Sequence, residues 1–469
     1  MHGKRGVPMT PRVGWLFAYD WDRQALDSLA ADHRLRFDHA GFDLFAFPSN
    51  AGLVGFDLDR FAQRQAARGK RLGWQGVLSH HEQFGALGAA LVAERMGLPG
   101  ATPESILAAQ HKLHARQVLQ QVAPEANLPS TELPCGYGEA IPPGLSYPSF
   151  VKPVKAAFSV LARRVDSQAE LYEHTRFGRW ELWVIRSLVE PFERVCRARL
   201  PQAGSAHRMM LESPVPVHVA QYNLDGWVQD GRVQMLGVVD AIMYPGTQAF
   251  MRWEHPSQSS AAVQQRAFDV AQRFLSAIGY RHGFFNLEFF YDASRDQLTV
   301  IECNPRLASQ FADLYRRVQG RDAHAMAVDL ALGKSPQTRA TQAPTAGAAA
   351  SIVYRSFAGE PVPAAPSAQA EAQMTAQFPG SMLHRFAKQG SSLERDFKWT
   401  GSHRYGIIHL GASDPEQLRL HTEQASAMLG WPAPYLDVYA DGRADTSGHS
   451  PQSEQADPWQ PAMAHSTGA

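Results

Sequence analysis

The sequence predicts an α/β protein in three parts: an open α/β domain, a central domain with a chemically distinctive β-hairpin, and a small C-terminal α+β domain. Three observations support this fold class. Short apolar segments alternate with helical stretches over residues 1–100, which is typical of an open α/β sheet. Residues 284–291 and 298–304 are two β-rich runs joined by a polar turn. Residues 336–350 are rich in Ala, Thr, Pro and Gln, which indicates a linker.

The N-terminal domain shows strand and helix signals in alternation. A first strand begins at Val13, and a short buried strand begins at Gly76. Between residues 82 and 96 the Ala, Leu and Val residues recur at helical spacing, and Gly97 is placed to end that helix. The first strand is not followed by Gly-x-Gly-x-x-Gly, so the sequence argues against a dinucleotide site.

The central domain begins with a clear helix start at Thr102-Pro103, and this helix carries Lys112. The segment from Tyr147 to Pro153 predicts an edge-type strand that ends at proline and carries Lys152. After the linker come two further strand-like segments and a helix, and then a polar tail that we expect to be disordered. The predicted parts are residues 1–100 (N-terminal α/β domain), 101–335 (central domain of two lobes), 336–350 (linker), 351–440 (C-terminal α+β domain) and 441–469 (tail).

Composition excludes several classes of function. Lys+Arg and Asp+Glu both number 45 in 469 residues, so the formal net charge is zero, which argues against nucleic acid or an anionic membrane as the main partner. Cys135, Cys196 and Cys303 lack metal-binding spacing and indicate a reducing compartment. No apolar run approaches the roughly 20 residues that span a bilayer. We therefore expect a cytoplasmic protein.

The predicted hairpin brings two carboxylates and two amides to one surface. Asn286 and Glu288 share a face of the first strand because side chains alternate along a strand, and Glu302 and Asn304 share a face of the second. If the turn is centred on Arg295, Glu288 lies opposite Glu302. Asn286 likewise lies opposite Asn304. Opposed like charges are destabilising unless a hard divalent cation such as Mg²⁺ binds them; the alternative is two solvated glutamates.

The hairpin sequence, Asn-x-Glu-Phe-Phe followed by Ile-Glu-x-Asn-Pro-Arg, resembles the metal-binding end of the ATP-grasp fold. Stretches that contain Lys112, Lys152 and residues 209–233 resemble the other parts of that fold, in the order the family requires. The resemblance covers roughly residues 75–330. It implies an ATP-grasp fold with an N-terminal pre-ATP-grasp domain, and it implies ATP as the nucleotide and Mg²⁺ as the metal ion, with Mn²⁺ as an alternative.

The resemblance also implies roles for individual residues. Glu288, Glu302 and Asn304 would hold the metal ions. Arg306 would stabilise charge on the transferring group, and Arg252 is a second candidate for contact with the substrate or the phosphate. The following residues would contact the nucleotide: Lys112, Lys152 and Ser159 at the phosphates, Glu212 and Val215 in the hinge beside the adenine, and Phe290 on the base.

Two alternatives stay open for the lysines. Lys152 lies in an otherwise apolar strand, so it either faces a phosphate or protects a sheet edge. Lys155 is an alternative to Lys152. The segment from Val154 to Leu161 contains no glycine, whereas many ATP-grasp enzymes have a glycine-rich flap at this place.

The reaction implied by the resemblance is that of a carboxylate–amine ligase. ATP phosphorylates a carboxylate, an amine or similar nucleophile attacks the acyl phosphate, and ADP and phosphate are released. The partners would be small-molecule carboxylate and amine substrates, with a homodimer as one alternative for the assembly. Two rival functions are a biotin-carboxylase-like enzyme acting on bicarbonate and a catalytically silent nucleotide-binding regulator. The glycine-free segment favours the regulator, whereas the intact set of Glu288, Glu302, Asn304 and Arg306 favours an enzyme.

Overall fold

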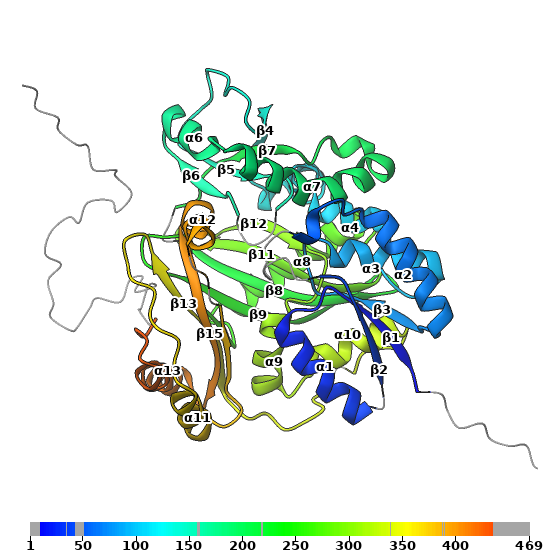
Figure 1. The fold of residues 1–469 in the computed structure, drawn as a ribbon, viewed down its shortest axis with the longest axis vertical. Helices are drawn as coiled ribbons and strands as arrows, with labels where there is room; N and C mark the ends of the chain where they lie inside the picture. Colours follow the sequence, from blue (N-terminus) through cyan, green and yellow to red (C-terminus); the bar gives the residue numbers. More distant parts are fainter. Residues whose placement is uncertain are drawn as a thin grey trace, which may run out of the picture.

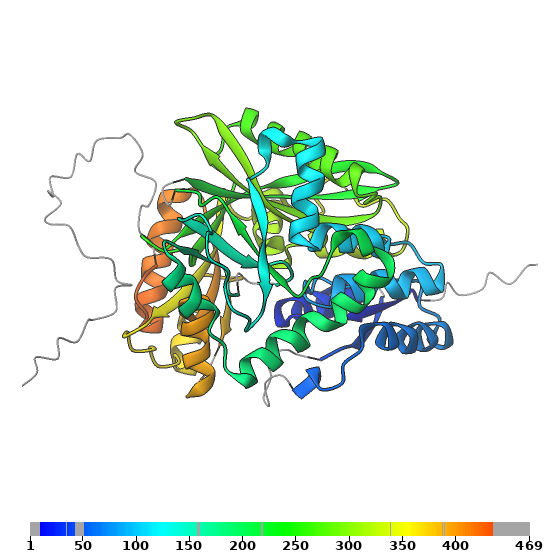
Figure 2. The same cartoon turned by 90° about the horizontal axis from the view of Figure 1, so that it is seen from above.

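The computed structural model describes residues 10–33, 35–42, 51–156, 160–216, 219–337, 339–386, 388 and 390–434. The described residues form three sheets of three, four and eight strands (Figure 1). The four-stranded sheet and its helices form a separate lobe above the larger body, and the view from above shows this lobe lying over the eight-stranded sheet (Figure 2). Within the described residues, no helix combines the length and the apolar character needed to cross a membrane.

The N-terminal part is an open parallel sheet with strand order β2-β1-β3, as the sequence predicts. Successive side chains of β1 point into two hydrophobic cores on opposite faces of the sheet. Trp15 packs with α1 and α10, whereas Leu16 packs with α2 and α3. The elements are β1 (Arg12–Leu16), α1 (Asp20–His33), β2 (Arg36–Ala40), η1 (Ala51–Leu53), α2 (Leu58–Leu72), β3 (Gly76–Leu78) and α3 (Gly85–Met96).

The helix expected after Thr102 is two helices. The Thr102 side chain accepts from the Ser105 N–H and Pro103 is the first helical residue, so the predicted start is confirmed. The helix breaks at His111, which ends α4 (Pro103–Gln110) and caps α5 (Lys112–Val122) with its ring. Lys112 therefore stands at the first position of α5, and its N–H donates to the Val154 carbonyl at 3.1 Å. A short η2 (Pro124–Ala126) follows.

The upper lobe is a four-stranded antiparallel sheet with the order β4-β7-β5-β6. Its elements are β4 (Ser130–Gly136), β5 (Ser149–Pro153), β6 (Arg163–Val165), α6 (Gln168–Thr175), α7 (Arg179–Arg199), η3 (Pro201–Ala203) and β7 (Arg208–Glu212). The strand that carries Lys152 lies between β7 and β6, so the predicted edge position is wrong and Lys152 does not protect a sheet edge.

The large sheet is antiparallel throughout, with the order β12-β11-β8-β9-β10-β13-β15-β14. Its central elements are β8 (Ala220–Gln229), β9 (Arg232–Met243), β10 (Phe250–His255), α8 (Ala261–Ala277), β11 (Gly283–Asp292), β12 (Gln297–Asn304), η4 (Ser309–Phe311), α9 (Ala312–Gln319) and α10 (Ala323–Ala331). The two strands of the predicted hairpin are thus confirmed as β11 and β12.

The C-terminal strands extend this same sheet. β13 (Ala348–Phe357) pairs with β10, β15 (Ser402–Ala412) pairs with β13, and β14 (Met382–Arg385) forms the last edge. The remaining elements are α11 (Ala368–Gln377), α12 (Ser391–Thr400) and α13 (Pro415–Leu429). The segment expected as a linker therefore runs into β13, and the C-terminal residues complete the platform on which the hairpin lies. Residues 441–469, expected to be a disordered tail, lie outside the described residues.

Candidate functional site

The acidic residues of the hairpin meet as the sequence predicts. Glu288 lies opposite Glu302, and Asn286 opposite Asn304. Near the turn the pairing is offset by one residue, because Tyr291 faces Leu298 and the register shifts between Glu288 and Phe289. The extra residue is Ile301, a β-bulge in β12. Without this bulge the turn would place Ile301, and not Glu302, opposite Glu288.

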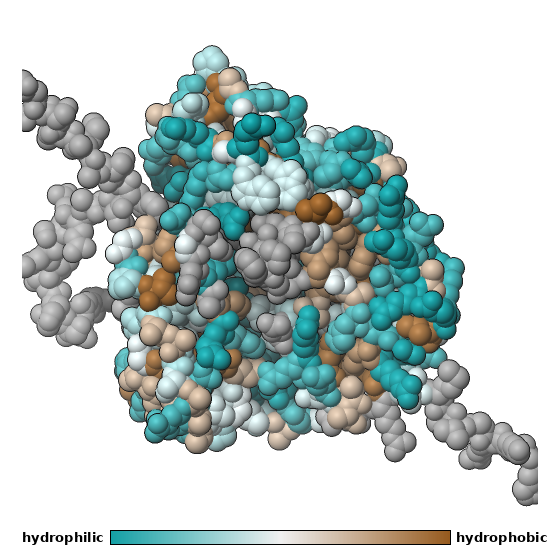
Figure 3. Space-filling view, viewed as in Figure 1, coloured by the Kyte–Doolittle hydropathy of each residue, from teal (hydrophilic) through white to brown (hydrophobic). Residues whose placement is uncertain are grey.

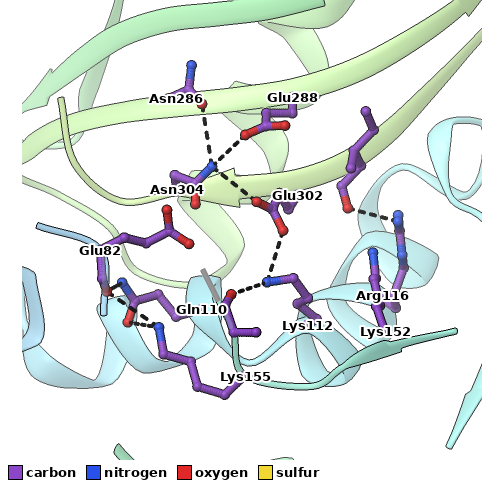
Figure 4. Close-up of polar contacts among 12 residues, drawn as sticks. Glu82, Gln110, Lys112, Arg116, Lys152, Lys155, Asn286, Glu288, Glu302 and Asn304 are labelled. Carbon is purple, nitrogen blue, oxygen red and sulfur yellow. Dashed lines mark hydrogen bonds and ion pairs between the residues drawn. The ribbon is translucent and has the colours of Figure 1, made fainter. Parts of the chain in front are cut away.

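The acid pair is held by donors from Asn304 and Lys112 (Figure 4), and the Gln221 amide also donates to Glu288 Oε2 at 3.3 Å. Asn304 Nδ2 donates to Glu288 Oε1 at 3.1 Å and lies 3.4 Å from Glu302 Oε1. Lys112 Nζ lies 3.0 Å from Glu302 Oε2. Burial, and then the charge of Glu302, raise the pKa of Glu288. Burial opposes ionisation of Glu302 as well, but Lys112 and Lys152 outweigh it, so the pKa of Glu302 is lowered.

This donor set fits a divalent cation. Glu288 and Glu302 offer carboxylate oxygens on one face, and both side chains are only partly buried, so an ion can reach them. Rotation of the Asn304 amide by 180° would replace its N–H₂ with an oxygen, the third ligand atom of the kind that Mg²⁺ prefers. A bound cation would also neutralise the repulsion that raises the pKa of Glu288.

Arg116 of α5 fixes the bulge, and sequence reasoning missed it. Its Nη1 donates to the Val300 carbonyl at 2.6 Å and its Nη2 to the Ile301 carbonyl at 2.9 Å. Its Nε donates to Glu212 Oε1 at 2.7 Å. The side chain is 3% exposed, so these bonds are shielded from water. Its spacing from Lys112 could have indicated Arg116, because the two residues are four apart and share one face of the helix.

Three lysines lie at three different places around the acid pair and the hinge. Lys112 meets Glu302 and also donates to the Ala156 carbonyl at 2.9 Å. Lys152 Nζ lies 2.8 Å from Glu212 Oε2. Lys155 Nζ donates to Gln110 Oε1 at 3.1 Å and to the Glu82 carbonyl at 3.4 Å, and burial lowers its pKa to about 7. Lys152 and Lys155 thus occupy distinct positions and are not equivalent.

The predicted hinge lies where the chain passes from one sheet to the next. Glu212 ends β7 in the upper lobe, and residues 213–216 lead toward β8 in the large sheet. The Glu212 carboxylate is buried between Arg116 and Lys152, and Val215 is partly exposed. Phe290, also partly exposed, stands two residues after Glu288 and therefore on the same face of β11. Ser159 lies outside the described residues.

Arg306 follows β12 and reaches the N-terminal part. Its Nη2 lies 2.6 Å from Glu82 Oε2, in the segment between β3 and α3. Glu82 is a second residue that sequence reasoning missed. Its position in the sequence could have indicated Glu82, because it follows a strand of the parallel sheet, where ligands of open α/β sheets bind. The loop after β12 and the N-terminal part thus meet at an ion pair.

Arg252 does not join this group. It pairs in register with Ile352, whose side chain packs under α11 and α13, whereas Trp253 and Ser351 point to the face that carries Glu288. The Arg252 guanidinium lies 2.7 Å from Glu254 Oε1. The structure therefore separates Arg252 from the other predicted site residues.

Behind the acid pair, a buried network holds Asn286. Its Nδ2 donates to Asp225 Oδ1 at 3.0 Å, and the Tyr315 hydroxyl donates to Asp225 Oδ2 at 2.7 Å. Burial raises the pKa of Asp225 to about 7, against the effect of these two donors. The network ties β8, β11 and α9 together beneath the site, and so limits movement of the strand that carries Glu288.

The fold of this chain also occurs in solved structures. L-amino acid ligase from Bacillus licheniformis superposes with a TM-score of 0.65 at 16% identity, over 89% of this chain and 97% of that one. N5-carboxyaminoimidazole ribonucleotide synthetase from Thermus thermophilus gives 0.58 at 18% identity, over 90% and 100%. Biotin carboxylase from Campylobacter jejuni gives 0.57 at 14%, over 89% and 91%. The chain has the ATP-grasp fold.

Sequence comparison adds little to the ATP-grasp assignment. No family model matches the chain. The uncharacterized protein y4rH from Sinorhizobium fredii is 25% identical over 256 residues, which is 54% of this chain and 47% of that protein. The matched stretch spans about half the length of this curated relative. The ATP-grasp fold of the chain therefore rests on its structure, and its chemistry rests on the residues described above.

Proposed function

We propose that this protein is an ATP-dependent ligase that activates a carboxylate as an acyl phosphate and joins it to an amine. The observation that carries the proposal is the pairing of Glu288 with Glu302, with Asn304 and Lys112 beside them, at the junction of the two lobes. The structural neighbours include ligases by name, and two are described as complexes with ATP or an ATP analogue.

The nucleotide would lie between the upper lobe and the large sheet. Lys112 and Lys152 would exchange their present carboxylate partners for phosphate oxygens, and Glu212 and Val215 would face the base and ribose from the hinge. Phe290 would pack against the base from the large sheet. Glu288, Glu302 and Asn304 would hold Mg²⁺, which would neutralise the charge of the phosphates.

The chemistry then needs two displacements. A carboxylate oxygen attacks the γ-phosphorus, and the bond from that phosphorus to ADP breaks. The amine nitrogen attacks the acyl carbon, the bond to phosphate breaks, and the nitrogen loses a proton. Arg306 would stabilise the negative charge that develops in both steps, an effect worth about 3–4 kcal/mol for one donor in other enzymes. Glu82 holds the guanidinium in position.

The test is calorimetric titration of ATP, with and without Mg²⁺, into the wild type and Glu302→Ala. We expect Mg²⁺-dependent binding that the variant loses, and then ADP release when pairs of carboxylates and amines are supplied. Glu416→Ala, an exposed residue of α13, is the matched control and should behave as the wild type. Equal Mg²⁺-dependent turnover by Glu302→Ala would contradict the metal assignment.

The same experiment separates the two rivals. Nucleotide binding without ADP release for any substrate pair would support a catalytically silent regulator, as the glycine-free sequence from Val154 to Leu161 suggests. ADP release that depends on bicarbonate and free biotin, without an amine, would support a biotin-carboxylase-like enzyme.

A further inference from the structure

Two arginines face each other in the large sheet. Arg355 of β13 lies directly opposite Arg404 of β15, so their side chains leave the sheet on the same side. Val353, two residues before Arg355, points to this side and packs against β10 and α9. The register of the two strands shifts between Tyr354 and Arg355, and Arg404 lies on the same side, over the ring of Phe386, which packs against that cluster. Ser351 pairs with Trp253 of β10, and this row of paired residues continues across β9 and β8 to β11. There it ends beside Glu288, on the same face of the sheet. The arginine pair therefore lies on the face that carries the acid pair.

Neither guanidinium has an acidic partner. Among the residues that the structure describes, no carboxylate oxygen lies within 4.0 Å of Arg355 or Arg404. Arg355 donates to the Phe250 carbonyl and to Ser402 Oγ, both at 3.0 Å. Arg404 lies over the Phe386 ring at 4.1 Å. This distinguishes the pair from Arg116 and Arg306, whose charges are matched by glutamates.

Asp396, the acid that interacts electrostatically with both arginines, is already engaged. Asp396 accepts from Lys388 at 2.7 Å and lies 3.0 Å from His403 Nδ1. Burial lowers the pKa of Arg355 and of Arg404 to about 10, with Asp396 opposing the change in both. Both side chains are nevertheless partly exposed, so a ligand can reach them.

Such an arrangement is costly without an anion. Like charges directly opposite each other destabilise a sheet, and a buried charge needs a partner. Side chains at opposed positions start about 5 Å apart, which lets both guanidinium forks contact one carboxylate or one phosphate. We propose that Arg355 and Arg404 bind an anionic group, a carboxylate or a phosphate, on the acceptor amine. This rests on the proposed ligase function.

The position of the pair suits an acceptor and does not suit the nucleotide. The pair is separated from the acid pair by about five strand spacings, roughly 20 Å or more across the sheet. Tyr19 interacts electrostatically with both Arg306 and Arg404: burial raises the pKa of Tyr19 and Arg306 opposes that rise, and Tyr19 opposes the lowering of the Arg404 pKa by burial. Tyr19 stacks on Trp21, and Trp21 meets His384 edge-on at 5.7 Å.

An elongated acceptor would therefore place its amine near Arg306 and its anionic group at Arg355 and Arg404, along a wall of aromatic side chains. The face of the molecule seen in Figure 3 is mostly hydrophilic with scattered apolar spots. The ligand class is thus an amine that also carries a carboxylate or a phosphate.

The experiment uses two probes, inorganic phosphate and succinate. Each is titrated calorimetrically into the full-length protein, first saturated with Mg²⁺ and a non-hydrolysable ATP analogue, and then without nucleotide. We expect the wild type to bind at least one probe, Arg404→Gln to weaken that binding at least ten-fold, and Arg404→Lys to retain part of it. Arg266→Gln, an exposed arginine paired with Asp296, is the control. The stronger probe identifies the anion.

Two outcomes would overturn the proposal: no binding of either probe to the wild type, or equal binding by Arg404→Gln. Folding of the variant is checked by urea unfolding, and Arg404→Gln should be at least as stable as the wild type because it removes one of two opposed charges. Failure of the proposed ligase function would show as absent ATP binding, whereas failure of this site shows in the nucleotide-free titration. The two results are therefore distinguishable.

Discussion

Arg116 Nη2 donates to the carbonyl of Ile301 at 2.9 Å, and Ile301 is the bulged residue of β12 that has no partner in β11. One helix residue thus fixes the point at which the hairpin register changes. Because that shift places Glu302 opposite Glu288, the geometry of the acid pair depends on an arginine about which the hairpin sequence gives no information.

Arg116→Ala should destabilise the protein strongly. The change leaves two carbonyls without a donor and leaves the buried Glu212 with Lys152 alone. Breaking a buried pair in this way costs about 3–5 kcal/mol. Urea unfolding measures the loss in the free energy of unfolding. Arg273→Ala is the control, since Arg273 also bonds a carboxylate (Glu125) and a carbonyl but is 43% exposed, and it should cost less than about 1 kcal/mol.

Glu288→Gln should stabilise the metal-free protein at high pH and abolish Mg²⁺ binding. Burial and Glu302 raise the pKa of Glu288 in the folded protein above that of the unfolded chain. Above the ordinary carboxyl pKa the unfolded chain therefore binds fewer protons, and the stability of the wild type falls as pH rises. The gain from Glu288→Gln, measured by urea unfolding in EDTA, should be larger at pH 8.5 than at pH 5. A gain that is independent of pH would contradict the raised pKa.

Asn304→Asp should make stability dependent on the metal ion. A third carboxylate would replace the amide that now donates to Glu288, so the metal-free protein should unfold at a lower temperature. Mg²⁺ should restore more stability to this variant than to the wild type, because the ion gains a charged ligand. Thermal unfolding with and without Mg²⁺ gives both values. If Mg²⁺ raises the unfolding temperature of the variant no more than that of the wild type, residue 304 is not a ligand.

Lys155→Met should remove a second pH dependence of the stability, opposite in sign to the one that Glu288 causes. Burial lowers the pKa of Lys155 from 10.5 to about 7. Between these two values the unfolded chain binds more protons than the folded protein, so the stability of the wild type rises with pH, by up to about 1.4 kcal/mol per pH unit. The difference in unfolding free energy between wild type and variant should therefore change from pH 7 to pH 9. The exposed Lys70, changed to Met, should show no such trend.

The sequence predicted the parts of the fold whose signals are local. The two hairpin strands follow from alternation and from one polar turn, whereas their register at the acid pair depends on the bulge at Ile301; the helix start at Thr102 follows from capping chemistry. The strand-like segment after the predicted linker is confirmed as β13, but its place in the large sheet has no local signal. Its pairing with β10 joins residues about a hundred positions apart, and nothing in the composition of the intervening segment reports that contact.

The residues of the candidate site also divide into those with a local sequence signal and those without one. Glu288, Glu302 and Asn304 came from a pattern within one hairpin, whereas Arg116 and Glu82 reach the site from other parts of the chain. Arg252 is the reverse case. The sequence around it resembles a site segment, but strand alternation turns its side chain to the other face of the sheet. Side-chain direction depends on register, which a single sequence specifies only across short turns.

The strand that carries Glu302 is also the outermost strand of the eight-stranded sheet. An open strand edge offers unpaired main-chain groups to other chains and invites aggregation. Here the carbonyls of Val300 and Ile301 are occupied by Arg116 from the same chain, and the bulge twists the edge. The residue that sets the spacing of the acid pair thus also shields the edge of the sheet, and substitutions there would lower the yield of refolded, monodisperse protein together with its activity.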